Sequence, residues 1–403
     1  MAESMLTVEA ALERLTAGLR PTEAETVSLA DVLDRAPVDR AVTATHDVPP
    51  FANSAMDGFA LLAADADDPR LVVGESRAGG PRPPSVGPGT AVRVMTGAPI
   101  PPGADAVVPV EEVDERGDRL VVRVAPARGA HVREAGHDVP MGTQVRLPRR
   151  PIGAATVALL AALGEVRVPV HRRPRVAILS TGDELAALGA PLGPGQIHDA
   201  NGPALAAAVR AAGGEAVLLE PARDDEAEVE SRLRDTVGCD LVIASGGVSV
   251  GRYDHVRTVL ERIGSLDFWR IAVQPGKPLA FGHVDGRPVV GLPGNPVSAL
   301  VTFELFVRPM LRALLDLPGD GRIHVPARLT ARLPKSAPRR AYLRVVVAAD
   351  PGADGYRAAP AGGQASSQLL PLVAGNALLI VPEGLEAGEA GATYETILLE
   401  PVA

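Results

Sequence analysis

Two glycine-rich turns in the second half of the chain each follow a short apolar run, and this pattern strongly constrains the fold. The apolar runs are 241–244 and 288–292, and the turns are 245–251 and 292–298. An unbroken apolar run of this length is typical of a parallel strand covered on both faces. Ligands bind at the carboxyl ends of such strands in open α/β sheets. The sequence therefore predicts a phosphate or another anionic ligand at these two turns.

The turn at 292–298 also carries the signals of a helix start. Asn295 suits the N-cap position, Pro296 suits the first helical position, and an apolar helical pattern begins at Val297. The free N–H groups and the dipole of a helix N-terminus favour an anion, and Gly294 permits close backbone approach. For one such turn, a capped connection that binds nothing is the simpler interpretation. Two turns on neighbouring strands favour a binding site.

A third apolar run, 176–179, is followed by hydroxyls, a glycine and two carboxylates at 180–184. Carboxylates beside phosphate-binding glycines suggest a bridging divalent cation, because two anions in one cleft repel each other unless a metal lies between them. The alternative role of Asp183 or Glu184 is a helix cap. The candidate binding residues of the three turns are Ser180, Thr181, Gly182, Gly246, Gly247, Ser249, Pro293, Gly294, Asn295 and Pro296.

Composition limits the class of protein. A chain of 403 residues predicts about two or three domains. The net charge of −9 argues against a nucleic-acid-binding protein. One cysteine, Cys239, excludes an intramolecular disulfide and a cysteine-rich zinc site. The most apolar stretch, 154–163, is too short to cross a bilayer and no signal peptide is evident, so we expect a cytoplasmic protein with no membrane partner.

The pattern along the chain predicts an α/β fold with additional β domains. Helices are expected at 5–19, 28–36 and 152–163, and strands at 71–73, 91–95, 106–110 and 120–124, the last two joined by a hairpin turn at 115–118. From 176 to 315 strands and helices alternate, which predicts a doubly wound parallel sheet with strands at 176–179, 216–219, 241–244, 270–273 and 288–292. Short strands at 325–333, 342–348, 377–381 and 394–399 predict a C-terminal β barrel or sandwich, of which we choose the barrel.

The expected domains follow these changes of pattern. Residues 1–44 and 139–172 form a linking domain, and an inserted small β domain spans 45–138. The α/β domain spans 173–318, and the barrel domain spans 319–403.

Six segments, in order, resemble the molybdopterin molybdenumtransferase family, which includes the E domain of gephyrin. The resemblance covers essentially the whole chain. The segments are PPFANSAMDGFA at 49–60, RVMTGAP at 93–99, STGDEL at 180–185, GGVS at 246–249, PGKP at 275–278 and GLPGNP at 291–296. Each motif is weak alone, but six in the family's order make chance resemblance very unlikely.

The resemblance implies a function that no spacing reveals. The family inserts molybdate into adenylylated molybdopterin and releases AMP. It implies Mg²⁺ and an elongated homodimer, whose cleft combines the α/β domain of one subunit with the small β domain of the other. Molybdopterin adenylyltransferase and acceptor molybdoenzymes are the implied protein partners.

The family's functional positions transfer to this chain residue by residue. The implied catalytic residues are Asp57, Asp138, Glu184, Asp254 and Lys277, of which Glu184 and Asp254 are the implied metal ligands. The implied binding residues are Thr96, Arg133, Asp224, Arg270, Gln274, Pro293, Pro296 and Ser366. From the residues alone, Asp57 could be a turn former, Asp254 a helix N-cap and Arg270 part of a solvated strand face.

Three positions depart from the family pattern. Gln274 stands where lysine is common in relatives, His137 precedes Asp138 where glutamate is common, and no histidine follows Ser366.

Three other functions compete with molybdate insertion, the most distant being a pyridine-nucleotide hydrolase that shares the α/β module. The related molybdopterin adenylyltransferase shares the α/β fold, but it is normally a compact single domain without the β segments at 45–138 and 319–403. A non-catalytic dimeric scaffold of the gephyrin E-domain type is the second alternative. The carboxylates Asp57, Glu184 and Asp254 favour catalysis, because a scaffold has no need of charges that destabilise an empty cleft.

Overall fold

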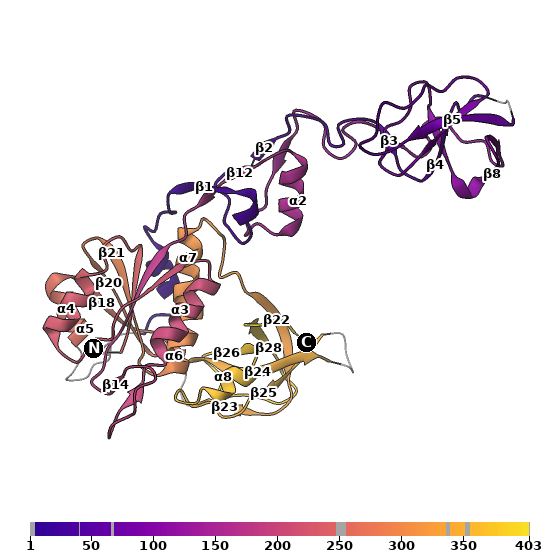
Figure 1. Ribbon diagram of the computed structural model, residues 1–403. Coiled ribbons are helices and arrows are strands. Elements are labelled where there is room, and N and C mark those ends of the chain that lie inside the picture. Colours follow the sequence, from indigo (N-terminus) through magenta and orange to yellow (C-terminus); the bar gives the residue numbers. More distant parts are fainter. Residues whose placement is uncertain are drawn as a thin grey trace.

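The molecule is elongated, with an α/β unit and a β barrel at one end and a smaller β sheet at the other (Figure 1). A narrow stalk joins the two ends. The computed structural model describes residues 5–39, 41–65, 68–246, 255–335, 339–350 and 355–402. None of the described helices is long and apolar enough to span a membrane.

The α/β unit contains a six-stranded sheet in which four strands are parallel. In sheet order the strands are β16 (Glu215–Leu218), β13 (Arg175–Ser180), β17 (Leu241–Ser245), β21 (Arg287–Leu292), β20 (Pro278–Val284) and β18 (Gly264–Arg270). The first four are parallel to one another, as the apolar runs predict, whereas β20 is antiparallel to both of its neighbours, β21 and β18. The prediction of a wholly parallel sheet with a strand at 270–273 is therefore wrong at this edge. Asp285 and Gly286 have positive φ and form a two-residue turn that reverses the chain between β20 and β21.

Helices cover both faces of this sheet, so the doubly wound architecture is confirmed. Along β13, Val176 and Ile178 pack in one core, whereas Ala177 and Leu179 pack in another. The helices on the first face are α1 (Val8–Thr16), α3 (Asn201–Ala211), α6 (Pro296–Thr302) and α7 (Arg308–Leu314), with a π-helical stretch, Phe303–Val307, between the last two. On the second face lie α4 (Glu226–Arg234) and α5 (His255–Ile263).

The stalk consists of two short antiparallel pairs and one helix. The pairs are β1 (Ala24–Ser28) with β12 (Arg167–His171) and β2 (Ala41–Thr43) with β11 (Gln144–Arg146), and the helix is α2 (Ala154–Ala162). The predicted helix at 28–36 is wrong, because Ser28 ends a strand and only a 3-10 turn, Leu29–Asp31, follows. The Ser28 hydroxyl donates to the Asp31 carboxylate at 2.6 Å instead of capping a helix.

The small sheet at the far end, which we call the distal lobe, contains the strands predicted between 71 and 124. In sheet order they are β7 (Ala106–Pro109), β4 (Gly58–Leu61), β6 (Thr90–Val94), β5 (Arg70–Ser76), β9 (Arg119–Val122) and β8 (Val113–Arg116). A two-stranded pair, β3 (Asn53–Ser54) with β10 (Val132–Arg133), lies beside them. A hairpin turn does lie at the predicted place, but it joins β9 to β8, and the prediction that it joins the strand at 106–110 is wrong, because β7 lies at the other edge of the sheet.

The C-terminal region is a closed five-stranded barrel, as the sequence predicts. Its strands are β24 (Arg340–Ala349), β25 (Tyr356–Pro360), β22 (Ile323–Leu329), β28 (Thr393–Leu398) and β26 (Ala377–Val381), and β26 pairs back with β24. Smaller elements are β19 (Val273–Gln274), which pairs with β24, the pair β23 (Leu333–Pro334) with β27 (Ala387–Gly388), and α8 (Leu370–Ala374). The predicted domain boundaries stay a prediction.

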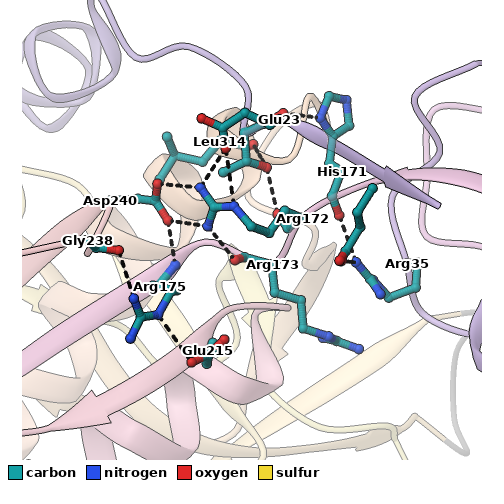
Figure 2. Close-up of polar contacts among 12 residues, drawn as sticks. Glu23, Arg35, His171, Arg172, Arg173, Arg175, Glu215, Gly238, Asp240 and Leu314 are labelled. Carbon is teal, nitrogen blue, oxygen red and sulfur yellow. Dashed lines mark hydrogen bonds and ion pairs between the residues drawn. The ribbon is translucent and has the colours of Figure 1, made fainter. Parts of the chain in front are cut away.

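A polar network joins the stalk to the α/β unit where β12 leads into β13 (Figure 2). The Arg172 guanidinium donates to both carboxylate oxygens of Asp240, at 2.8 and 2.9 Å, and to Glu23 at 2.7 Å. The backbone N–H of Arg175 donates to the same Asp240 carboxylate at 2.6 Å. Since Glu23 and Arg172 lie on the stalk side and Asp240 precedes β17, this network fixes the direction in which the stalk leaves the sheet.

A buried carboxylate joins the α/β unit to the barrel. Glu304, in the π-helical stretch, accepts hydrogen bonds from Arg308 at 2.6 and 2.9 Å and from Arg322 at 2.9 Å to each oxygen. Arg322 lies just before β22 and also donates to the Leu399 carbonyl at 2.7 Å. Burial alone would raise the pKa of Glu304, but the two guanidinium groups outweigh it and hold the pKa below its ordinary value. The carboxylate therefore stays charged and ties both guanidinium groups together.

Glu304→Gln should destabilise the folded protein by about 3–5 kcal/mol, because it leaves the buried Arg308 guanidinium and the half-buried Arg322 guanidinium without their shared anion. The pKa of Glu304 is lowered in the folded state, so its contribution is complete above the unfolded pKa and is lost as the pH falls through the lower folded value. Calorimetric melting of the wild type should therefore show a loss below about pH 4.5 that the Gln variant lacks. Glu261→Gln, which breaks the exposed pair with Arg257, is the matched control and should cost under about 1 kcal/mol. Equal costs for the two variants would contradict this role.

Candidate functional site

Three strand ends meet at one edge of the α/β sheet. Ser180 of β13 pairs with Ser245 of β17, which pairs with Leu292 of β21, so the turns after these strands lie side by side. A cleft of about 980 Å³ opens above them, between the α/β unit and the barrel. The sequence prediction that these turns form one site is thus supported by their geometry. The candidate residues that line the cleft are Ser180, Thr181, Gly182, Glu184, Asp224, Gly246, Gln274, Lys277, Pro293, Gly294, Asn295, Pro296 and Ser366.

Two glycines allow the turns to approach each other. Gly246 has a φ of +93°, and a Cβ at this position would lie 2.5 Å from the Thr181 carbonyl oxygen. Gly182 has a φ of +152°, and a Cβ there would lie 2.4 Å from Glu184 Oε2. Any side chain at these positions would push the turns apart or displace the Glu184 carboxylate. The cleft floor therefore consists of backbone and short side chains.

The side chain of Asn201 ties two of the turns together. Its amide nitrogen donates to Ser245 Oγ at 2.8 Å and to the Gly294 carbonyl at 2.7 Å. Asp199 holds the start of α3 in place, because its carboxylate accepts from the backbone N–H groups of Asn201 and Gly202 at 2.9 Å each. The sequence analysis missed both residues. The Asp-x-Asn-Gly-Pro run at 199–203 carries only a helix-start signal, so it does not reveal the bonds to the neighbouring turns.

Several buried polar atoms on the cleft have no hydrogen-bond partner among the described residues. They are Ser180 Oγ, Thr181 Oγ1, His198 Nδ1 and Asn201 Oδ1. Buried polar groups in folded proteins are nearly always paired, so an unpaired group in a cleft points to a ligand or ordered water. Four such atoms on one cleft surface indicate a polar ligand.

The start of α6 is oriented as predicted, with one difference. Asn295 occupies the N-cap position, but its side chain does not cap the helix and instead donates to Ser366 Oγ of the barrel at 3.2 Å. The first-turn N–H groups are therefore not capped by Asn295, which keeps them available to an anion. The bond to Ser366 also connects the floor of the cleft to its opposite wall.

The barrel and the segment before β20 supply the remaining walls. Gln274 and Lys277 come from that segment, and Arg339 and Gln364 come from the barrel. Lys277 and Arg339 place two cations on the cleft surface, which suits an anionic ligand. Arg339 and Gln364 were missed by the sequence analysis, because neither stands in a turn that follows a buried strand.

The distal lobe carries a second, separate group of candidate residues. The Asp57 carboxylate accepts from the backbone N–H of Thr96 at 2.6 Å and from its hydroxyl at 2.8 Å. These two hydrogen bonds lower the pKa of Asp57, which is exposed. Arg133 lies on β10 opposite Asn53, in the strand just before the Asp57 turn. Asp138 is exposed, and its backbone N–H donates to the Val48 carbonyl at 3.0 Å.

The structure does not bring the two groups together within one chain, because the distal lobe and the cleft lie at opposite ends of the molecule (Figure 1). Arg270, at the end of β18, does not appear among the described residues that line the cleft. Gly247, Ser249 and Asp254 fall outside the described residues, so their predicted roles stay predictions.

The described residues contain no group of three or more His, Cys, Asp or Glu side chains placed to hold a metal ion. Mg²⁺ usually binds one or two carboxylates together with substrate phosphates and retains several waters. Glu184 and the unpaired Thr181 hydroxyl offer the hard oxygen atoms that this ion prefers. The residues present therefore fit a magnesium ion that is shared with a phosphate ligand.

Comparison with known protein families divides the chain into three matched regions. Residues 6–164 match the family model "MoeA N-terminal region (domain I and II)", and residues 177–313 match "Probable molybdopterin binding domain". Residues 326–399 match "MoeA C-terminal region (domain IV)". Together these matches extend over most of the chain.

Individual relatives agree with the family models. The molybdopterin molybdenumtransferase 2 of Mycobacterium tuberculosis is 42% identical over 367 residues, which covers 87% of this chain and 89% of the relative. The molybdopterin molybdenumtransferase of Haemophilus influenzae is 39% identical over 315 residues, with 77% and 78% coverage. A crystal structure of a molybdopterin biosynthesis MoeA protein from Pyrococcus horikoshii has a TM-score of 0.82 at 28% identity and covers 98% of this chain and 100% of its own.

Gly246→Ala should destabilise the protein by about 2 kcal/mol more than Gly189→Ala does. Both glycines have positive φ, but only a Cβ at 246 meets the Thr181 carbonyl, since a Cβ at 189 has nothing within 4 Å. Denaturant unfolding of the two variants measures both losses of unfolding free energy. Their difference separates the cost of a Cβ that contacts the Thr181 carbonyl from the cost of a non-glycine residue at positive φ. Equal losses in the two variants would show that the turns do not pack as closely as described.

Proposed function

The chain belongs to the molybdopterin molybdenumtransferase family, and we propose that it inserts molybdate into adenylylated molybdopterin with release of AMP. Its relatives are transferases of molybdenum cofactor biosynthesis. The main support in the structure is the cleft at three strand ends, where unpaired polar atoms, an N-terminus of α6 not capped by its Asn295 side chain and two cations lie together. A substrate with phosphate groups and a polar ring system matches these features.

Each wall of the cleft has a proposed role. The turns at Ser180, Gly246 and Gly294 bind the phosphates through backbone N–H groups and hydroxyls. Lys277 balances the charge of the anionic substrate and of molybdate, and Glu184 holds a magnesium ion. The ion would screen the substrate phosphates from the carboxylates of the cleft. Asp224, Gln274 and Ser366 complete the binding surface.

We propose that the protein is a homodimer in which the distal lobe of one subunit completes the cleft of the other. Two observations support this arrangement. Asp57, Thr96, Arg133 and Asp138 belong to the same family pattern as the cleft residues, and the stalk keeps them at the far end of their own chain. The apolar side chains Phe51, Met56 and Met95, which adjoin Asp57 and Thr96 in sequence, are about two-fifths exposed. A surface of this kind is suited to burial against a partner.

The alternatives are not favoured. The family models match the distal lobe and the barrel as well as the α/β unit, which argues against an adenylyltransferase of one domain. The relatives are named transferases, which argues against a purely structural scaffold. The cytoplasmic location stays a proposal. Acceptor molybdoenzymes and the adenylyltransferase stay proposed partners.

The shared cleft predicts recovery of activity when two inactive variants are mixed. Purified wild type, with adenylylated molybdopterin, Mg²⁺ and molybdate, should release AMP and reconstitute a cofactor-free molybdoenzyme. Asp57→Ala and Lys277→Ala should each abolish this activity. After subunit exchange, an equal mixture should regain about a quarter of wild-type activity, because half of the dimers contain one intact cleft. A mixture of Asp57→Ala with Thr96→Ala is the control and should stay inactive, since both lesions lie in the same lobe. Inactivity of the first mixture despite proven exchange would contradict a shared cleft.

Magnesium should tighten the binding of adenylylated molybdopterin at least about tenfold, because a cation relieves repulsion between substrate phosphates and Glu184. Calorimetric titration with and without Mg²⁺ measures this difference. In Glu184→Gln the dependence on Mg²⁺ should largely disappear. Equal affinities in wild type with and without the ion would exclude a bridging magnesium.

A further inference from the structure

Arg344 of β24 is buried on the outer face of the barrel, because its neighbours Leu343 and Val345 face the barrel core and Leu378, which pairs with it, packs against the core of the α/β unit. It is the largest fully buried side chain among the described residues, with 1% of its surface exposed. Arg344 forms no ion pair with a described carboxylate. Burial lowers the pKa of its guanidinium, which nevertheless remains protonated at neutral pH. The nitrogen atoms Nε and Nη1 are buried and lack a hydrogen-bond partner in the described part of the chain. A buried charge of this kind is costly, and apolar residues of similar volume are often more stable.

The hydrogen bonds that Arg344 does make all lead to one loop. Its Nη2 donates to the carbonyl oxygens of Gly363 and Ala365 at 3.1 Å each. Its backbone N–H donates to Gln364 Oε1 at 2.9 Å, and its carbonyl accepts from Gln364 Nε2 at 3.1 Å and from the N–H of Ala361 at 3.1 Å. The loop 361–366 therefore wraps around Arg344. Because these carbonyls are the guanidinium's described partners, the loop cannot move away without leaving the charge unsatisfied.

The far end of the same loop is a wall of the cleft. Gln364, Ala365 and Ser366 line it, and Ser366 Oγ accepts the hydrogen bond from Asn295 at the start of α6. A continuous series of contacts thus runs from the buried guanidinium, through the carbonyls of Gly363 and Ala365, to the floor of the cleft. Arg344 itself does not line the cleft.

We propose that Arg344 is a positioning residue, which fixes the loop 361–366 so that Ser366 and Gln364 face the substrate. The effect of Arg344 on substrate binding rests on the proposed function, whereas its effect on the position of the loop 361–366 does not. The cost of burying an uncompensated guanidinium is offset by hydrogen bonds that exist only while the loop is in place. Arg344 and the loop thus stabilise each other.

Hydrogen exchange of the loop amides tests the structural part without any substrate. In Arg344→Met, the amides of Ala361, Ala365 and Gln368 should exchange at least about tenfold faster, because the charged hydrogen bonds to the loop are lost. The amides of β26 should keep their protection, since Arg344 faces away from the barrel core and its replacement leaves that core intact. Arg357→Met, at an exposed position on β25 of the same barrel, is the matched control and should change neither. Unchanged loop exchange in Arg344→Met, or equal loss of protection throughout the barrel, would overturn the proposal.

Kinetics tests the consequence for the site. Arg344→Met should raise the KM for adenylylated molybdopterin at least about tenfold with a smaller change in kcat, because it displaces a binding wall. Ser366→Ala should add little further in the Arg344→Met background, since the loop has already lost its position. If the KM of the double variant instead rises by the product of the two single-variant increases, Arg344 does not act through Ser366 and the proposed role is overturned.

The remaining outcomes are also decisive. If Arg344→Met does not fold, Arg344→Lys and Gln364→Ala provide the same comparison, because each removes part of the contacts to the loop and neither residue belongs to the barrel core. Arg344→Lys, a point donor, should restore only part of the loop protection. Full restoration would overturn the role of the guanidinium geometry. Wild type that releases no AMP would refute the proposed function, while the exchange result would still decide the role of Arg344.

Discussion

The carboxylate of Glu304, shared between Arg308 and Arg322, is the contact on which the candidate site most depends. The cleft is formed between two parts of the molecule: its floor belongs to the α/β sheet and its opposite side belongs to the barrel. Apolar packing of Leu378 and Ile397 against the core of the α/β unit holds the two parts together but is not directional. Four charge-assisted hydrogen bonds to one buried carboxylate fix the orientation of the barrel relative to the α/β unit, and this orientation sets the width of the cleft.

The stalk sets a second constraint, because it keeps the candidate residues of the distal lobe apart from the cleft of the same chain. The Arg172 network fixes the stalk against the sheet, and the two-stranded pairs make it more rigid than a single linker would be. Asp57 and Thr96 are already arranged in the distal lobe, because two hydrogen bonds hold the carboxylate in its charged form. Within one subunit the two groups of candidate residues therefore stay apart, and the proposed dimer would bring the distal lobe of one subunit to the cleft of the other.

The sequence predicted those parts of the site that obey a local rule. Apolar runs followed by glycine turns placed Ser180, Gly246 and Gly294 at one sheet edge, since the ends of parallel strands must meet. Asn201 and Arg339 escaped prediction, because their roles depend on contacts with segments far away in the chain. The antiparallel strand β20 was not predicted, although Asp285-Gly286 is a hairpin signal. The regular alternation of strands and helices before it favours a parallel sheet and outweighed this signal. The helix at 28–36 failed because Ser28 and Asp31 bond to each other.

The first helix has a consequence for the order in which the protein acquires its structure. Helix α1 packs in the same core as α7 and Phe303, Leu6 exchanges backbone hydrogen bonds with Arg270 and Ala272, and Glu9 pairs with Arg340. On a ribosome, the distal lobe emerges with all of its strands by residue 133, long before the partners of α1 are synthesised. The lobe can therefore fold before the segments that pack against α1 have been synthesised. The apolar face of α1, with Val8, Ala11 and Leu15, stays exposed through most of translation, and chaperones have their main opportunity to act on it during this interval.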